Sequence, residues 1–150
     1  EAVEWLLKKG LSLESKDNEG QSLLVYAAGN PNPEVIDYLM NAGLSLEEET
    51  KENLSRILLI AVKKNPNAGF VRKLIKIGAD IEAKDEKGAT PLMLAAQFNP
   101  SAEMMSVLLE LGASPRAKDQ NGRIAFDYAM EGKHLKSEAY WELQEASQRK

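Results

Sequence analysis

Short apolar clusters alternate with polar, turn-forming segments along the chain, and this alternation is periodic. One cluster has apolar residues at positions i, i+1, i+4 and i+5, namely Val35, Ile36, Leu39 and Met40. This spacing places the four side chains on one face of an α-helix. A glycine that can end the helix follows this cluster and its counterparts, at spacings of 33, 35 and 34 residues: Gly10, Gly43, Gly78 and Gly112. The spacing indicates an internal repeat.

A second, more uniformly apolar segment precedes the first in each full unit. Residues 92–96 predict a short buried helix, and Thr90 followed by Pro91 is typical of an N-cap and a first helical position. Ser22 occupies the equivalent capping position in an earlier unit. The segment 85–88 before this helix has the form Asp-x-x-Gly, which indicates a turn because glycine readily adopts positive φ.

An Asn-Pro linker separates the two helices of each unit. Proline disfavours the helical conformation in the residue before it, so the first helix is expected to end at this linker. The next polar residue is then placed to cap the second helix, and these residues are Asn32, Asn67 and Ser101. Each unit therefore predicts a helix-turn-helix followed by a turn.

Two short helices, a glycine-containing loop and a period of 33–35 residues resemble the ankyrin repeat family. The matching residues are Asp85-x-x-Gly88-x-Thr90-Pro91-Leu92-x-Leu94-Ala95-Ala96 and Val107-Leu108-Leu109-x-x-Gly112-Ala113. The resemblance extends over essentially the whole chain and implies an all-α solenoid of stacked helix-turn-helix units with hairpin-like loops. The linker Asn-Pro-Asn-Pro-Glu-Val-Ile also resembles a variant associated with bacterial ankyrin proteins.

We expect residues 1–150 to form a single repeat domain. It would contain a partial N-terminal repeat (1–16), full repeats (17–49, 50–84 and 85–118) and a C-terminal capping repeat (119–150). The partial repeat has no first helix, so Val3, Leu6 and Leu7 are expected to form an apolar edge. The first residue is not Met, which favours a longer parent protein.

The third unit departs from the repeat pattern, and the environment of two tyrosines can also be predicted from it. In the third unit Leu54 replaces the turn glycine, and a run of glutamates at 47–49 precedes it, so its hairpin loop is expected to deviate or to be mobile. Tyr26 and Tyr128 share one repeat position and are expected in the core.

The composition contains few of the residue types that most often form catalytic sites. The chain has no cysteine and a single histidine, His134, which we interpret as a surface or capping residue. No glycine-rich phosphate loop occurs, because the turn glycines come one to a repeat. We therefore predict no catalytic site, no cofactor and no metal. The formal charge of −4, from 19 basic and 23 acidic residues, argues against a nucleic-acid partner.

No apolar run approaches the roughly 18–20 residues that cross a bilayer, so we predict no membrane partner. The chain start lacks signal-peptide features, which favours the cytoplasm and leaves a processed secreted or periplasmic form open.

The resemblance implies a non-catalytic scaffold that binds a protein partner through the concave face and loop tips of the solenoid. Phe98 is the strongest single candidate for a binding hot spot, with packing against the adjacent linker as its alternative. The predicted contact residues are Asn18, Glu19, Gln21, Glu52, Asn53, Lys63, Lys64, Glu86, Lys87, Gln97, Phe98, Gln120, Asn121 and Arg123. Two alternatives remain: self-association through the N-terminal edge, and a regulatory or tethering role within a larger protein.

Overall fold

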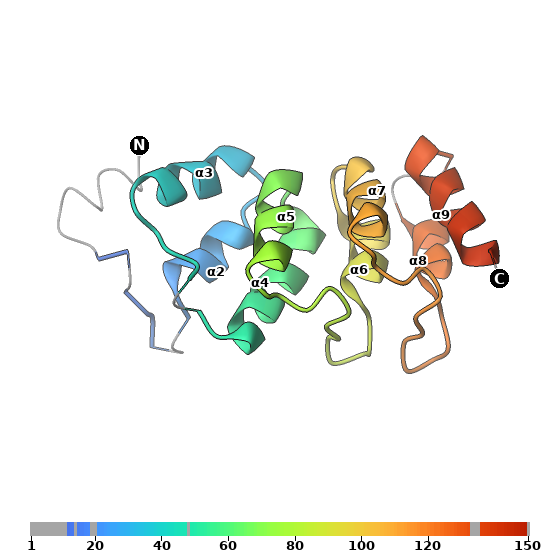
Figure 1. Ribbon diagram of the computed structural model, residues 1–150, viewed down its shortest axis with the longest axis horizontal. Helices are drawn as coiled ribbons and strands as arrows, with labels where there is room; N and C mark the ends of the chain where they lie inside the picture. Colours follow the sequence, from blue (N-terminus) through green and yellow to red (C-terminus); the bar gives the residue numbers. More distant parts are fainter. Residues whose placement is uncertain (1–11, 14, 19–20, 48, 133–135, 150) are drawn as a thin grey trace.

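The computed structural model describes residues 12–13, 15–18, 21–47, 49–132 and 136–149. Eight helices lie in this part of the chain: α2 (Leu23–Ala28), α3 (Pro33–Asn41), α4 (Lys51–Lys64), α5 (Ala68–Lys76), α6 (Pro91–Phe98), α7 (Glu103–Glu110), α8 (Ala125–Glu131) and α9 (Glu138–Gln148). Figure 1 shows them as successive pairs stacked along the long axis, with α2, α4, α6 and α8 in one row and their partners in another. The predicted all-α solenoid is therefore confirmed.

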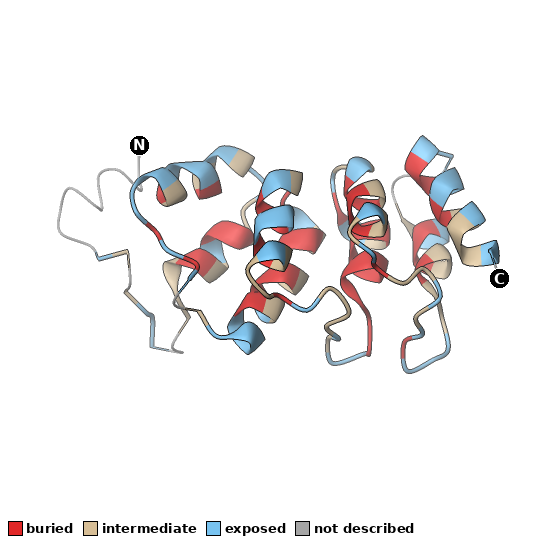
Figure 2. Cartoon of the chain, viewed as in Figure 1, coloured by how far each residue is buried: buried red, intermediate tan, exposed pale blue. Residues whose placement is uncertain are grey.

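The hydrophobic core is distributed along the stack rather than gathered at one centre (Figure 2). Helix α6 packs against α4, α8 and its own partner α7, and its residues from Pro91 to Ala96 are buried. The helices of this row meet closely because each contributes small buried side chains, at Ala28, Ala61, Ala95 and Ala129. Each pair thus completes the core of its neighbours.

The second helices α3, α5 and α7 end in the same backbone motif. After α3, the N–H of Leu44 donates to the carbonyl of Leu39 at 2.9 Å, and the N–H of Gly43 donates to Met40 at 3.1 Å. This Schellman motif requires a left-handed residue, and Gly43 has a φ of 102°. The same motif follows at Gly78 and Gly112, so these predicted helix ends are confirmed, whereas Gly10 lies outside the described residues.

The Asn side chains of the linkers cap two second helices as predicted. Asn32 accepts a hydrogen bond from the N–H of Glu34 at 3.0 Å, and Asn67 accepts one from Phe70 at 2.9 Å. The prediction for Ser101 is wrong, because α7 begins one residue later, after Ala102. The Ser101 N–H donates to the Asn99 side chain at 2.8 Å, and the N–H groups of Asn32 and Asn67 make the same bond to the preceding linker asparagine.

The first helices begin where the sequence predicts. Ser22 and Thr90 hold the N-cap positions of α2 and α6 in extended conformation, and Pro91 is the first residue of α6. Proline fits this position because its missing N–H has no partner within the helix in any case.

The third unit deviates as expected, since extra helix replaces the hairpin loop. Helix α4 has 14 residues, and the Thr50 side chain caps it by accepting from the N–H of Asn53 at 3.2 Å. Glu52 and Asn53, predicted at a loop tip, therefore lie in the first turn of a helix. Without the Asp-x-x-Gly turn, the capped segment continues as helix, and Leu54 is buried in the core.

Tyr26 and Tyr128, which share one repeat position, have different environments. Tyr128 is 3% exposed, as predicted, but Tyr26 is 58% exposed, so the prediction of a core position for Tyr26 is wrong. Helix α6 packs against α8 and helps to cover Tyr128, whereas no helix precedes α2 in the described part of the chain. The predictions for Val3, Leu6, Leu7 and His134 fall outside the described residues.

Hydrogen bonds join residues that are about one repeat apart. The buried Asn99 amide donates to the carbonyls of Val62 at 2.8 Å and Asn65 at 3.1 Å. At the surface, the Gln120 amide donates to the carbonyl of Glu86, 34 residues earlier, at 3.1 Å. The sequence period is therefore also the spacing of contacts along the stack.

The described helices include none that is both long and apolar enough to cross a membrane.

We predict that Asn99→Ala destabilises the fold far more than Gln120→Ala. The first change leaves buried carbonyls without a donor and should lower the free energy of unfolding by about 1–3 kcal/mol. The second removes a bond exposed to water and should cost about 0.5 kcal/mol or less. Urea unfolding followed by circular dichroism measures both values, and equal losses would contradict the importance of the buried bond.

Candidate binding surface

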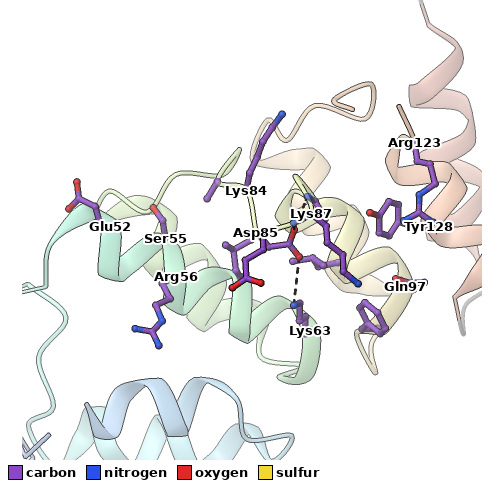
Figure 3. Close-up of a pocket in the computed structure, with 16 residues that line it drawn as sticks. Glu52, Ser55, Arg56, Lys63, Lys84, Asp85, Lys87, Gln97, Arg123 and Tyr128 are labelled. Carbon is purple, nitrogen blue, oxygen red and sulfur yellow. Dashed lines mark hydrogen bonds and ion pairs between the residues drawn. The ribbon is translucent and has the colours of Figure 1, made fainter. Parts of the chain in front are cut away.

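A groove of about 810 Å³ lies on the face formed by the first helices and the hairpin loops (Figure 3). Helices α4 and α6 contribute one side, and the loop around residues 83–89 contributes another. Arg123 and Tyr128 of the following unit also line it. The groove thus draws side chains from three consecutive helix pairs.

Seven of the predicted contact residues come together in this groove. They are Glu52, Lys63, Glu86, Lys87, Gln97, Phe98 and Arg123. These residues are up to 71 positions apart in sequence, and the stacking of the repeats brings them to one surface.

The other predicted residues lie beside the groove or at loop tips. Gln21 and Asn53 line a smaller hollow between α2 and α4, and Lys64 lines a shallow hollow with Phe98 and Pro100. Asn18, Gln120 and Asn121 are exposed at hairpin turns. Glu19 lies outside the described residues.

The repeat pattern places residues 52–55 at a loop tip, so it does not identify the helix face of α4 that lines the groove. Arg56 and Leu59 follow Glu52 by four and seven residues, so all three share one helix face. The signal was present in the sequence: Thr50 precedes an uninterrupted helix-forming segment that contains no glycine.

Phe98 lies at the end of α6, and its ring is 45% exposed. It lines the groove on one side and the shallow hollow beside Pro31 and Pro100 on the other. The ring therefore adjoins the linkers but keeps a large area open to solvent. An exposed aromatic side chain offers much contact area for the loss of few rotamers.

An aspartate organises the loop that presents Glu86 and Lys87. The Asp85 carboxylate accepts from the N–H groups of Lys87 and Ala89, both at 2.9 Å. Gly88 has a φ of 77°, and an added Cβ would lie 3.0 Å from the N atom of Gln120 in the next loop. The loop is thus held both by its own hydrogen bonds and by its neighbour.

The next loop contains the same arrangement around Asp119, with further partners. Its carboxylate accepts from the N–H groups of Asn121 at 2.8 Å and Arg123 at 2.9 Å, and from the Tyr128 hydroxyl at 2.8 Å. The Arg123 guanidinium donates to it at 3.1 Å and lies 4.3 Å from the centre of the Tyr128 ring. This cluster fixes the end of the groove.

The partners of Asp119 also set its ionisation. Burial opposes the charged form, but the hydrogen bonds from Tyr128, Arg123 and Asn121 outweigh this effect and lower the pKa of Asp119 to about 2. Burial and the bond to this carboxylate raise the pKa of the Tyr128 hydroxyl. At neutral pH the cluster thus contains a neutral tyrosine and an ion pair.

Metal ligands do not gather in the described part of the chain. No group of three or more histidine, aspartate or glutamate side chains there is placed to hold a metal ion.

These features define a class of protein, a solenoid of stacked helix pairs whose hairpin loops and first helices form an extended surface. A family model of ankyrin repeats in three copies matches residues 1–85 and, in a second match, residues 58–140. The chain therefore belongs to the ankyrin repeat family. A search of curated proteins gave no match.

We predict that the stabilising effect of the Asp119 carboxylate disappears in acid. Its folded pKa of about 2 lies below the ordinary value of 3.8, so the unfolded state binds more protons between these values. Its contribution to stability is complete above this window and is lost as the pH falls through it. Asp119→Asn should therefore be less stable than the wild type at neutral pH.

The difference between the two proteins should shrink between a pH of about 4 and about 2, because only the wild type gains this proton. Urea midpoints measured across that range test the expectation. A difference that stays constant with pH would show that the carboxylate charge is not what stabilises the loop.

Proposed function

We propose that this chain is a non-catalytic scaffold that binds a protein partner through the groove and the adjoining hairpin-loop tips. Ankyrin repeats are generally protein–protein interaction modules. The observation that carries the choice of face is the groove itself, which gathers a half-exposed aromatic ring and several charged side chains from three helix pairs.

The rigidity of this surface supports the proposal. The loops that carry Lys87 and Arg123 are held by Asp85 and Asp119, and the Gln120 N–H donates to the Lys87 carbonyl at 3.2 Å. Little conformational entropy is lost when a partner binds these ordered loops, and a smaller entropy loss increases affinity. The surface thus has both the contact groups and the preorganisation that recognition needs.

The two alternative functions stay predictions. Self-association would use the edge around Val3, Leu6 and Leu7, which lies outside the described residues. A regulatory or tethering role depends on other domains. Both are compatible with a binding groove, but no contact within the described residues favours either one. The division into a partial repeat, full repeats and a cap is likewise part of this proposal.

We predict that Phe98→Ala and Lys87→Glu each reduce capture of the cellular partner by at least about tenfold, since central aromatic and charged contacts dominate binding energy. The measurement is affinity capture with the 150-residue chain, quantified by mass spectrometry.

Tyr38→Ala on α3 is the matched control, because Tyr38 is 42% exposed but lies on the outer row of helices. Its capture should equal that of the wild type. A partner lost with Tyr38→Ala and kept with both groove variants would place binding on the other face.

A further inference from the structure

The residues that line the groove have a net positive charge, whereas the outer helices have a net negative charge. Five basic side chains and three acidic ones line it: Arg56, Lys63, Lys84, Lys87 and Arg123, against Glu52, Asp85 and Glu86. The outer helices α3, α5, α7 and α9 instead contain seven acidic residues and three basic ones. The groove lining thus has a net positive charge although the chain has a formal charge of −4, and the three basic residues of the outer helices all lie on α5.

Internal ion pairs neutralise only part of the positive charge in the groove. Lys63 pairs with Asp85 at 3.9 Å, and Arg123 pairs with the buried Asp119 at 3.1 Å. Within the described residues, Arg56, Lys84 and Lys87 make no ion pair, and of these Lys84 donates to the Lys118 carbonyl at 3.3 Å. Two exposed cations on the groove wall thus remain available to a ligand.

The acidic side chains cancel only part of this charge at the centre, where Asp85 pairs with Lys63 and leaves Lys87 without an ion pair. Glu52 lies in the first turn of α4, eleven residues before Lys63, or roughly 16 Å away along the helix axis. Figure 3 shows Lys63 and Lys87 near Gln97 in the middle of the groove, with Glu52 at its far end. Glu86 is exposed at the loop tip. The central part therefore keeps a positive character.

Apolar contact area lies in the same groove. Phe98 at the end of α6 and the partly buried Leu59 line the groove, whereas Leu94 in the same lining is buried in the core. A ligand with acidic groups alone would leave this area without a partner. A ligand that combines one large apolar side chain with acidic neighbours would use both features.

We infer that the groove binds a short acidic segment of a partner protein, with one large apolar side chain against Phe98 and aspartate or glutamate side chains facing Lys87 and Arg56. This inference rests on the proposed function and specifies the chemistry of its partner. The groove spans three stacked helix pairs, which at about 10 Å a step gives roughly 20 Å. An extended segment of about six residues covers that length.

The groove chemistry favours a protein segment over a nucleic acid. A continuous phosphate backbone would meet Glu52, Asp85 and Glu86 in the same groove, whereas a peptide can present neutral residues there. Binding of single-stranded nucleic acid also relies on several exposed aromatic rings for stacking. Of the two aromatic residues that line the groove, Phe98 is half exposed and Tyr128 is buried.

The test is selection from a library of random ten-residue peptides displayed on phage, with the 150-residue chain as bait. The selected sequences are expected to place aspartate and glutamate around one large apolar residue. Synthetic peptides of those sequences are then measured by fluorescence anisotropy. Arg56→Glu combined with Lys87→Glu should weaken their binding by at least about tenfold, which corresponds to about 1.4 kcal/mol.

The matched control is Lys73→Glu combined with Lys76→Glu on α5, which changes the net charge equally on exposed side chains of an outer helix. Its affinity for the acidic peptides should change less than about twofold, since distant exposed charges are screened. A loss of affinity as large as that of the groove variant would mean that overall charge alone drives binding and would overturn the inference.

Two further outcomes separate the inference from the function on which it rests. Selected peptides that are not acidic but depend on Phe98 would overturn the inference and leave the proposed function standing. If no groove variant changes the binding of the selected peptides or captured proteins, both the inference and the proposed function are overturned. Tighter binding of a thymidine oligonucleotide than of the acidic peptides would also contradict the inference.

Discussion

Each helix pair is stabilised by stacking on its neighbours, and both the hydrophobic core and the loop surface are built on this stacking. A pair such as α6 and α7 is too small to bury its own apolar face, so its core is completed by α4 on one side and α8 on the other. Small buried alanines allow successive helix pairs to approach closely. The buried Asn99 amide then joins one pair to the preceding pair through the carbonyls of Val62 and Asn65. These contacts fix the distance between successive loops.

The candidate surface follows from that constraint. Lys63, Lys87 and Arg123 belong to successive units, and they line one groove because the units are held in register. The aspartates at the base of the loops add local order, as Asp119 shows by holding two backbone N–H groups, a tyrosine and an arginine. The core and the surface therefore share one spacing, and a change in stacking would also change the groove.

Sequence patterns predict the repeated features well, because the same local chemistry occurs several times. The left-handed glycines and the Asn caps depend only on nearby residues, so Gly43, Asn32 and Asn67 match their predictions. The prediction for Ser101 is wrong because α7 begins after Ala102 and has no side-chain cap. The prediction of a buried Tyr26 is wrong for a non-local reason, because burial of this side chain requires a helix that packs before α2. Arg56 was missed because α4 replaces a loop, and the concentration of positive charge emerges only when distant units are assembled.

The central claim is that the face of first helices and hairpin loops contacts the partner. Hydrogen exchange followed by mass spectrometry, with the captured partner present and absent, tests it most directly. Slower exchange is expected at residues 85–89 and 97–99 in the complex, with outer helices α3, α5 and α7 unchanged. Protection confined to those outer helices would contradict it.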